Sequence, residues 1–263
     1  MTARAPVPGP APGPVEDDGQ LLAVLHAAAD AAALALAGAG DWGPSGARAG
    51  QYRSDLAADA AAVAVLLSAG LGVLSEESGR HGPEEPFLVV LDPVDGSANA
   101  AHRIPFFATS LCALDRAGPR AAVVAHLVTG TRYEATRGGG ARRDGGAIGP
   151  SGCGDLAAAV VGINGWPSQH LGWRQYRALG SAALELCAVA DGSLDGYLDV
   201  SRRGLAAWDY LGALLVCTEA GIPVVDGRGR DLVVRSAGER RAVLAAATPS
   251  LLEGIRAGWR SLQ

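Results

Sequence analysis

The sequence predicts an α/β protein in which helices pack against two separate β-sheets. Two observations carry this prediction. Short apolar strands and turn residues crowd the segment 71–136, whereas strands alternate with apolar helices over 160–260. The pattern changes near residue 150. We therefore expect an N-terminal α+β part over 19–150 and a C-terminal α/β part over 151–263.

The N-terminal part is predicted to begin with a tail and two helices. Residues 1–18 contain clustered Pro and Gly and are expected to form a disordered tail. The Ala/Leu-rich segment 20–38 is typical of a helix that ends at a glycine. A second helix is predicted over 56–69, with Asp55 as its N-cap and Gly70 as its stop.

Five strands should follow these helices. Each is a short apolar run bounded by turn residues, and they cover 71–75, 87–91, 107–114, 121–128 and 131–136. The last three are close together in the sequence, so we expect an antiparallel meander. The glycine-rich segment 137–146 precedes no helix, and this favours a hairpin turn over a phosphate-binding loop.

The C-terminal part alternates between strands and helices. The predicted strands cover 160–163, 195–200, 223–225 and 242–247. The predicted helices cover 180–191, 209–220 and 249–260. Strands separated by helices of this length are typical of a layered α/β arrangement.

Composition excludes several kinds of function. The chain has 263 residues, a net charge of −5 and no lysine, which rules out Schiff-base lysine chemistry and the phosphate lysine of Walker-type loops. The acidic balance argues against nucleic acid and membrane surfaces as partners. His26 and Asp30 interrupt the apolar stretch 21–37, so we do not expect it to span a membrane. Four widely spaced cysteines without a CxxC pair are typical of reduced thiols and predict a cytoplasmic protein.

The candidate functional residues are four carboxylates. Glu76 and Asp92 each follow a predicted strand, and α/β sheets bind ligands at such carboxyl ends. Asp95 comes three residues after Asp92 and is followed by Gly-Ser, and Asp209 opens a predicted helix. Asp209 alone could be only an N-cap, and Glu76-Glu77 alone could be a solvated surface pair. Together the four residues predict a site for hard cations and a phosphate.

Three motifs resemble those of the inositol monophosphatase family, whose members are magnesium-dependent, lithium-sensitive phosphatases. They are Ser75-Glu76-Glu77-Ser78-Gly79, Asp92-Pro93-Val94-Asp95-Gly96-Ser97 with Asn99, and Trp208-Asp209-Tyr210-Leu211-Gly212-Ala213. The similarity extends over about residues 20–250. It implies alternating αβαβα layers with two sheets, a homodimer, and hydrolysis of a small phosphorylated substrate.

The resemblance also implies a set of magnesium ligands. One Mg²⁺ is expected at Glu76, Asp92 and the backbone carbonyl of Val94. A second is expected at Asp92, Asp95 and Asp209, with Asp92 shared between the two. Oxygen ligands of this kind suit Mg²⁺, and a metal pair can stabilise both the attacking and the leaving oxygen of a phosphoryl transfer.

The same resemblance implies the remaining roles. The N–H groups of Gly96 and Ser97 are expected to hold the phosphate, while the Ser97 hydroxyl and Glu76 orient a metal-activated water. The expected catalytic residues are Glu76, Asp92, Asp95, Ser97 and Asp209. Further substrate contacts are expected at Gly180, Ser181, Ala182 and Asp199.

Two departures from the family pattern bear on the number of metals and on the substrate. In the family, an Asp-x-x-Thr-x-x-Asp pattern supplies a ligand for a third metal. This sequence lacks the Thr of that pattern, and either Asp55 or Asp59 could hold a third Mg²⁺. Inositol-specific members place a Glu shortly before the Trp-Asp motif. The nearest acid here is Asp199, which Arg202 and Arg203 follow. Either one of these arginines contacts a second anionic group on the substrate, or both are solvated.

The sequence thus predicts a Mg²⁺-dependent phosphatase that acts on a small phosphomonoester such as an inositol, sugar or cyclitol phosphate. A 3′(2′),5′-bisphosphate nucleotidase and a histidinol-phosphatase of the same superfamily are alternatives. A non-catalytic binding or regulatory protein that retains the scaffold is an alternative of another class. The presence of all four carboxylates favours the enzyme, because their mutual repulsion is costly in the absence of a metal.

Overall fold

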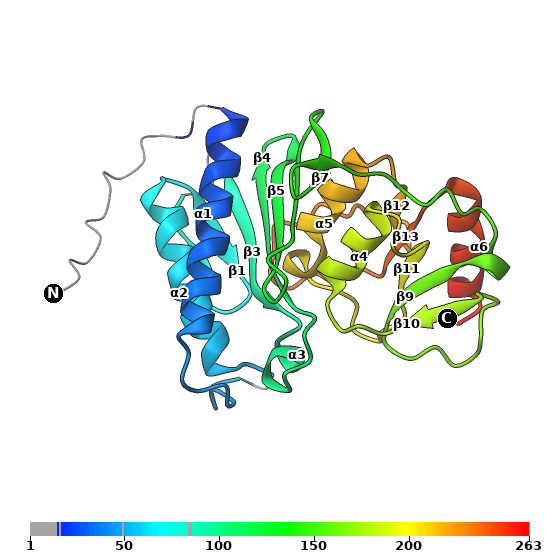
Figure 1. The fold of residues 1–263 in the computed structure, drawn as a ribbon, viewed down its shortest axis with the longest axis horizontal. Coiled ribbons are helices and arrows are strands. Elements are labelled where there is room, and N and C mark those ends of the chain that lie inside the picture. Colours follow the sequence, from blue (N-terminus) through cyan, green and yellow to red (C-terminus); the bar gives the residue numbers. More distant parts are fainter. Residues whose placement is uncertain (1–14, 16, 49, 84–85, 263) are drawn as a thin grey trace, which may run out of the picture.

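The chain folds into five alternating layers of helix and sheet, αβαβα (Figure 1). The computed structural model describes residue 15 and residues 17–48, 50–83 and 86–262. From one side to the other, the layers are two N-terminal helices, an eight-stranded sheet, two central helices, a five-stranded sheet and the C-terminal helix. This arrangement confirms the predicted fold class.

Helices α1 (Asp18–Ala37) and α2 (Arg53–Ser68) form the first layer and pack on one face of the large sheet. Asp17 caps α1 by accepting a hydrogen bond from the Gln20 N–H at 2.8 Å. The helix therefore begins inside the segment predicted to be a disordered tail. Most of that segment lies outside the described residues.

By length and composition alone, α1 is long and apolar enough to cross a membrane, with a mean hydropathy of 1.6. In the fold it is a core helix. Leu21 and Leu25 are fully buried between α2 and the large sheet. The polar His26 bonds to Glu134 of the sheet, with 2.6 Å between His26 Nε2 and Glu134 Oε2. His26, one of the polar residues that interrupt the apolar stretch, thus joins α1 to the sheet.

The large sheet has the strand order β2-β1-β3-β4-β5-β6-β7-β8. Strands β1 and β3 run parallel, and the other neighbours run antiparallel. The predicted meander is confirmed in β4, β5 and β6, and the glycine-rich segment forms hairpins at both ends of β7. The strands are β1 (Gly72–Ser75), β2 (Gly79–His81), β3 (Leu88–Asp95), β4 (Ala108–Asp115), β5 (Gly118–His126), β6 (Arg132–Thr136), β7 (Gly140–Arg143) and β8 (Gly146–Ala147).

The central layer consists of α4 (Ala182–Ala190) and α5 (Ala207–Glu219), which share one continuous core with both sheets. A short helix, α3 (Ser97–Ala101), follows β3. Helix α5 comes very close to β4 at Gly212, where an added Cβ would lie only 2.7 Å from the Ser110 Oγ. The absence of a side chain at this position sets how near α5 can lie to the sheet.

The second sheet has the order β10-β9-β11-β13-β12, and α6 (Pro249–Arg260) covers its outer face. Its strands are β9 (Val160–Asn164), β10 (Gln175–Arg177), β11 (Gly196–Asp199), β12 (Val224–Asp226) and β13 (Val243–Ala246), and a 3₁₀ turn (Leu156–Ala158) precedes them. The large sheet ends before residue 150 and this sheet begins after it. Separate domains on either side of that point stay a prediction.

Three local predictions differ from the structure. The strand expected over 87–91 continues to Asp95, through an irregularity described below. Asp55 is not the N-cap of α2, because Tyr52 holds that position and Asp55 lies buried in the first turn. Strands β2 and β10 were not predicted. Each has three residues and lies at a sheet edge, where no apolar run is needed.

Candidate active site

Strand β3 carries two acidic residues through a β-bulge. Asp92 pairs with Ser110 and Asp95 pairs with Ala108, so three steps along β3 oppose two along β4. In a regular strand, side chains three residues apart point to opposite faces of the sheet. The bulge cancels this alternation, and Pro93 within it has no N–H that would need a ladder partner. Both carboxylates therefore reach the same buried region, where burial and then the charges of Glu76 and Asp95 raise the pKa of Asp92.

Glu76 reaches this region from the neighbouring parallel strand. Ser75, the last residue of β1, is in register with Leu91 of β3. The Glu76 N–H then donates a hydrogen bond to the Leu91 carbonyl at 3.0 Å. Glu76 consequently stands beside Asp92 at the carboxyl ends of the two strands.

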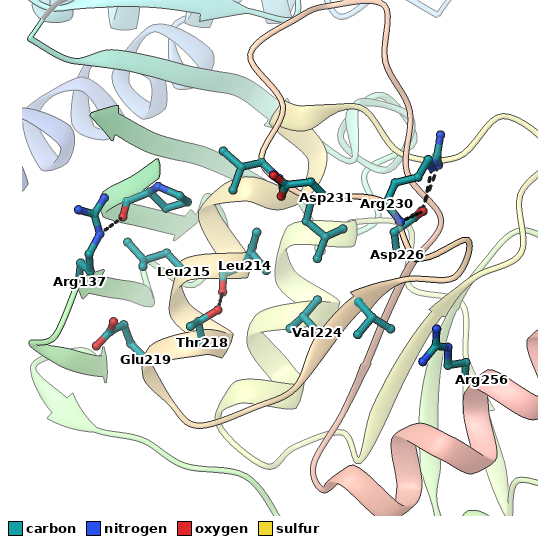
Figure 2. Close-up of a pocket in the computed structure, with 15 residues that line it drawn as sticks. Arg137, Leu214, Leu215, Thr218, Glu219, Val224, Asp226, Arg230, Asp231 and Arg256 are labelled. Carbon is teal, nitrogen blue, oxygen red and sulfur yellow. Dashed lines mark hydrogen bonds and ion pairs between the residues drawn. The ribbon is translucent and has the colours of Figure 1, made fainter. Parts of the chain in front are cut away.

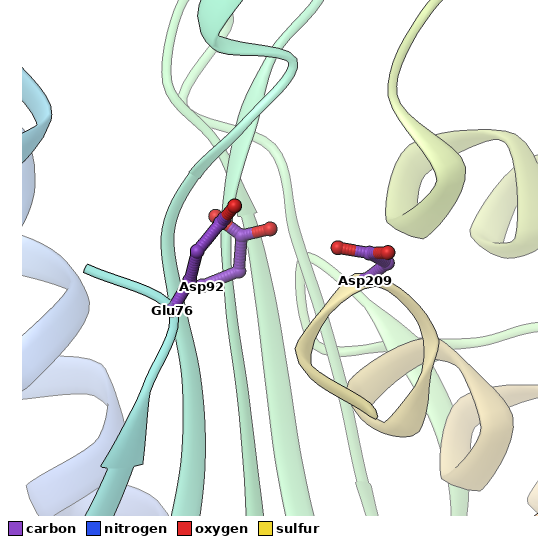
Figure 3. A group of neighbouring side chains, drawn as sticks. All are labelled: Glu76, Asp92 and Asp209. Atoms are coloured by element: carbon purple, nitrogen blue, oxygen red, sulfur yellow. The ribbon is translucent and has the colours of Figure 1, made fainter. Parts of the chain in front are cut away.

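Asp209 faces these two residues from the helix layer. It lies in the first turn of α5, after the N-cap residue Ala206, whose N–H donates to Asp209 Oδ2 at 2.7 Å. Carboxylate oxygens of Glu76, Asp92 and Asp209 all lie within 4.8 Å of one another. In Figure 3 the Glu76 and Asp92 side chains extend together from adjacent strands, and Asp209 points toward them across the gap. The structure therefore brings these three predicted residues together.

Burial and mutual repulsion make these three carboxyl groups weak acids. Burial, with added repulsion from Glu77, raises the pKa of Glu76 to about 7. Burial and then the charge of Glu76 raise the pKa values of Asp92 and Asp209 well above the usual range. Ionised together in so small a volume, the groups require a cation. Since all donor atoms are oxygens, the site fits Mg²⁺, which prefers such ligands.

Asp95 is held in place by the N-terminus of α4. Its Oδ2 accepts hydrogen bonds from the Ser181 Oγ at 2.6 Å and from the Ala183 N–H at 2.7 Å. Burial raises the pKa of Asp95 to about 6, and these two bonds oppose the rise. Ser181 and Ala182, both expected as substrate contacts, are buried here, and the Ser181 hydroxyl is engaged by Asp95.

The predicted phosphate turn and the segment before α4 lie against each other. Gly96 has a φ of +94°, and a Cβ there would lie 3.1 Å from the carbonyl oxygens of Gly180 and Phe106. Asn99 joins the same segments by donating to the Leu179 carbonyl at 2.6 Å. Only glycine fits this backbone conformation and this approach, so the turn tolerates no side chain at position 96.

Ser97 affects a carboxyl group that the sequence did not assign to it. Its Oγ donates to the Val94 carbonyl at 2.8 Å, and the same hydroxyl lowers the pKa of Asp55. Burial acts in the opposite sense and raises the pKa of Asp55 to about 6. Asp55 is 1% exposed, and its Oδ2 has no hydrogen-bond partner among the described residues. The first turn of a helix is a common place for a capping Asp, so sequence alone could not assign it to Ser97.

Asp55 and Asp59 differ in how they relate to the acidic group of Glu76, Asp92 and Asp209. Asp59 accepts a hydrogen bond from the Ser75 hydroxyl. Asp55 instead raises the pKa of Glu76 and is itself affected by the charge of Glu77. Glu77, which looked like part of a surface pair, has a side chain only 3% exposed. Asp55 thus combines a buried, unpartnered oxygen with a charge effect on Glu76, and this suits a further cation.

Asp199, the last residue of β11, is held by hydrogen bonds through one of its two carboxylate oxygens. Its Oδ1 accepts hydrogen bonds from the Asn164 Nδ2 at 3.0 Å and from the Ser201 N–H at 2.9 Å. Burial raises its pKa to about 6. The residue is fully buried, so in this structure it offers no surface to a substrate. Arg202 and Arg203, a few residues later, are exposed.

A cavity of about 470 Å³ lies apart from Glu76, Asp92 and Asp209 (Figure 2). It lies beside the second half of α5, where Leu214 and Thr218 form one wall. Thr218 is about 13 Å along the helix axis from Asp209. On its charged rim Arg230 is paired, since Arg230 Nε lies 2.8 Å from Asp226 Oδ2. Within the part of the chain that the structure describes, the acids of this cavity do not form a close group like that of Glu76, Asp92 and Asp209.

Comparison with known proteins identifies the family of this chain. The sequence profile of the Inositol monophosphatase family matches residues 53–262. The chain belongs to the inositol monophosphatase family. Its relatives include proteins named inositol-1-monophosphatase and fructose-1,6-bisphosphatase, and it is accordingly a phosphoric monoester hydrolase of this type.

Individual relatives cover most of the chain. The fructose-1,6-bisphosphatase of Pyrococcus furiosus is 32% identical over 191 residues, which are 71% of this chain and 74% of that protein. The inositol-1-monophosphatase of Mesorhizobium japonicum is 36% identical over 62% of this chain and 66% of its own length. The Nus factor SuhB of Salmonella typhimurium is 32% identical over 60% of this chain and 63% of its own length.

Solved structures share the whole architecture. The suhB protein of Bartonella henselae has a TM-score of 0.78 and 25% identity, covering 91% of this chain and 99% of that one. The inositol monophosphatase of Anabaena has a TM-score of 0.76 over 93% of this chain and 97% of that one. At 24% identity the second likeness concerns the fold alone.

Proposed function

We propose that this chain is a Mg²⁺-dependent phosphatase that hydrolyses a small phosphomonoester, such as an inositol, sugar or cyclitol phosphate. The observation that carries the proposal is the buried group of Glu76, Asp92 and Asp209, with ligand atoms within 4.8 Å of one another and pKa values raised by burial and repulsion. The names of the relatives support the substrate class.

In this proposal the carboxylates hold two magnesium ions. Glu76, Asp92 and the Val94 carbonyl hold one, and Asp92, Asp95 and Asp209 hold the other. When bound, Mg²⁺ supplies electrostatic stabilisation of the phosphoryl oxygens and makes a nearby water more acidic. The hydrogen bonds from α4 orient Asp95, and the backbone bond at the start of α5 orients Asp209.

A third magnesium ion, if the enzyme uses one, belongs beside Asp55. The buried and unpartnered Oδ2 of Asp55 supports this assignment over Asp59, which is already bonded to Ser75. The pKa of Asp55 near 6 makes it ionised at neutral pH and available to a cation.

The attacking water is oriented by Ser97 and Glu76. The Ser97 hydroxyl donates its proton to the Val94 carbonyl at 2.8 Å, so its oxygen is free to accept a hydrogen bond from the water. The N–H groups of Gly96 and Ser97 hold the phosphate at the start of α3. Water attacks phosphorus in line, and no covalent enzyme intermediate forms.

The residues that were expected to contact the substrate mainly hold other groups of the site in place. Ser181 holds Asp95, so it is a positioning residue in this proposal. The Gly180 carbonyl lies against Gly96, and Ala182 follows Ser181 at the start of α4. Asp199 supports the backbone at Ser201, just before the arginines.

We further propose that the enzyme is a cytoplasmic homodimer. Cys112, Cys187 and Cys217 are free and buried, and burial raises their pKa values, which suits a reducing compartment. The dimer rests on family membership. Light scattering coupled to size-exclusion chromatography tests it, and a mass of one chain at micromolar concentration would contradict it.

A binding or regulatory role is the second candidate, because one relative is named a Nus factor. The same-superfamily alternatives are a bisphosphate nucleotidase and a histidinol-phosphatase. One phosphate-release screen separates all of these. It uses inositol 1-phosphate, hexose phosphates, histidinol phosphate and 3′-phosphoadenosine 5′-phosphate, each with Mg²⁺ and with chelator.

The control for this screen is Asp92→Asn, which removes the shared ligand but keeps the shape. We expect Mg²⁺-dependent release for at least one substrate and a loss of more than about a thousandfold in the variant. No release from any substrate, together with no Mg²⁺ binding by calorimetry, would favour the binding protein.

Asp209→Asn tests the contribution of the helix layer. Turnover should fall by at least about a hundredfold, because the second metal loses a charged ligand. Glu253→Gln, the same carboxyl-to-amide change on exposed α6, is the matched control and should leave turnover unchanged. A fully active Asp209→Asn variant would refute the two-metal assignment.

A further inference from the structure

The cavity beside the second half of α5 lies where three layers of the fold meet (Figure 2). Its volume of about 470 Å³ falls within the range of about 300–1,000 Å³ that is usual for sites that bind small molecules. Each layer contributes apolar side chains to its wall. They are Leu214 and Leu215 of α5, Val224 and Val225 of the edge strand β12, and Pro119 of β5 in the large sheet.

Hydrogen bonds hold one side of this cavity in place. The segment 229–233 forms that side. The Leu232 carbonyl accepts a hydrogen bond from the Tyr210 Oη at 2.7 Å, and the Asp231 carbonyl accepts one from the Arg241 Nε at 2.5 Å. A wall that is already fixed loses little conformational freedom when a ligand binds, so binding costs less free energy.

Arg256 of α6 is the lining cation that has no partner. It makes no hydrogen bond or ion pair with any residue that the structure describes, and its Nε is buried. The other two lining arginines are neutralised. Arg230 Nε lies 2.8 Å from Asp226 Oδ2, and Arg137 Nη2 lies 2.9 Å from Asp115 Oδ1. A buried donor without an acceptor costs free energy, and an anionic ligand at Arg256 removes that cost.

The arrangement of the lining residues indicates the shape of such a ligand. Figure 2 shows Arg256 and Arg137 at opposite ends of the group. The apolar side chains of Val224, Leu214 and Leu215 lie between them. An anion at Arg256 therefore adjoins an extended apolar wall.

The charges of the cavity favour a ligand with one negative charge. Three arginines and three acids line it, and these are Arg137, Arg230 and Arg256 with Glu219, Asp226 and Asp231. Because Arg256 alone lacks a partner, one carboxylate balances the charge that is left. A phosphate dianion would bring a second negative charge into a cavity that three acids already line.

We propose that this cavity is a second ligand site, which binds a small monocarboxylic acid with an extended apolar body. The carboxylate accepts two parallel hydrogen bonds from the Arg256 guanidinium, a geometry that the planar fork of Arg favours. The apolar body packs against Val224, Leu214 and Leu215 and leaves water. The inference goes beyond the proposed function, because it requires neither bound Mg²⁺ nor hydrolysis.

The test uses octanoate as the probe and isothermal titration calorimetry of the full chain with Mg²⁺. Butanoate keeps the charge with a shorter body, and octan-1-ol keeps the body without the charge. Each should bind at least about tenfold more weakly than octanoate. Arg256→Leu should weaken octanoate binding by at least about tenfold, and Arg256→Lys should weaken it less. Arg260→Gln changes an exposed arginine of the same helix and should leave the affinity unchanged.

A second variant tests the apolar wall. Val224→Phe fills part of the cavity and leaves Arg256 in place, so it should also weaken octanoate binding. The inference is overturned if the unaltered protein does not bind octanoate, or if Arg256→Leu binds it as tightly as the unaltered protein does.

Asp92→Asn separates this site from the metal site. This variant should bind octanoate with unchanged affinity. If it loses octanoate binding, the carboxylate binds at Mg²⁺ and the inference is overturned. A protein that binds octanoate through Arg256 and hydrolyses no phosphate ester would contradict only the proposed function.

Discussion

The surroundings of each buried carboxyl group in this protein determine whether it is protonated or ionised. Glu185 is an example outside the group of Glu76, Asp92 and Asp209. It is 1% exposed, accepts a hydrogen bond from the Leu179 N–H at 3.1 Å, and has its pKa raised to about 8 by burial. At neutral pH it is thus mostly protonated, and it holds the backbone that leads to Ser181 without adding another negative charge near Asp95.

The raised pKa of Glu185 predicts a pH dependence of stability. The folded state keeps the proton up to about pH 8, whereas the unfolded state releases it near the ordinary value of 4.5. The unfolded state therefore binds fewer protons between these values, and the free energy of unfolding falls as pH rises through them. Glu185→Gln, which keeps an acceptor and cannot ionise, should flatten this fall. Urea unfolding of the Mg²⁺-loaded protein at pH 5, 6.5 and 8 measures the free energy of unfolding. If this free energy falls with pH equally in the variant and the unaltered protein, the raised pKa of Glu185 is contradicted.

Sequence could assign a residue to the site where its neighbours in the chain also belong to the site. Asp92 and Asp95 share one turn, and their acidic spacing with Gly-Ser predicted a metal and phosphate site. The partnership of Asp55 with Ser97 could not be found in this way, because it depends on how α2 lies beside β3. Asp199 was expected to face the substrate, and only the fold shows that Asn164 and Ser201 surround it.

At the scale of elements, α5 positions the last carboxylate, and Gly212 determines how closely it packs. Ser110, which an added Cβ at Gly212 would meet, is also the β4 partner of Asp92. This close contact therefore fixes the distance between α5 and the sheet, and it lies next to the bulge that carries Asp92. A small shift of α5 would move Asp209 relative to the two strands.

Gly212→Ala should lower both stability and turnover. Alanine gains up to about 1 kcal/mol in helix propensity, but the added methyl would lie 2.7 Å from Ser110 Oγ and 3.2 Å from the Leu111 carbonyl. Overpacking of this kind costs about 1–3 kcal/mol, so the net effect is a loss. Gly254→Ala on α6 meets only ordinary contacts and should stabilise the protein. Thermal unfolding and kcat distinguish the two, and a stabilised Gly212→Ala variant would contradict this packing.

Elements were predictable where burial forces a pattern. The helices and the long strands contain apolar runs that packing requires, and these were recognised. The edge strands β2 and β10 contain polar residues such as Arg80 and Gln175, because an edge needs no apolar face. The β3 extension was missed because Pro93 usually ends a strand, and here it occupies a bulge.

At the scale of the whole molecule, the acidic group joins the large sheet to the helix layer. Without metal, its carboxyl groups are protonated at low pH and ionise against each other as pH rises. The metal-free protein should therefore lose stability from about pH 5 to pH 8, since the unfolded state has ordinary pKa values and binds fewer protons. Mg²⁺ should cancel this loss.

The measurement is the Tm with Mg²⁺ minus the Tm with chelator, across that pH range. We expect the difference to grow with pH, because protons compete with the metal for the same oxygens. Asp92→Asn should show a smaller difference at pH 8. A difference that is constant with pH would mean that Mg²⁺ binds elsewhere.

The separation of the ligands along the chain also bears on biosynthesis. Glu76 and Asp209 are about 130 residues apart, so the ribosome must add half of the protein after the first ligand before the last one exists. Pairing so distant in sequence forms late during folding. Hydrolysis is then a property of the finished chain only. A truncated or stalled product would carry most of the carboxylates and yet release no phosphate into the cell.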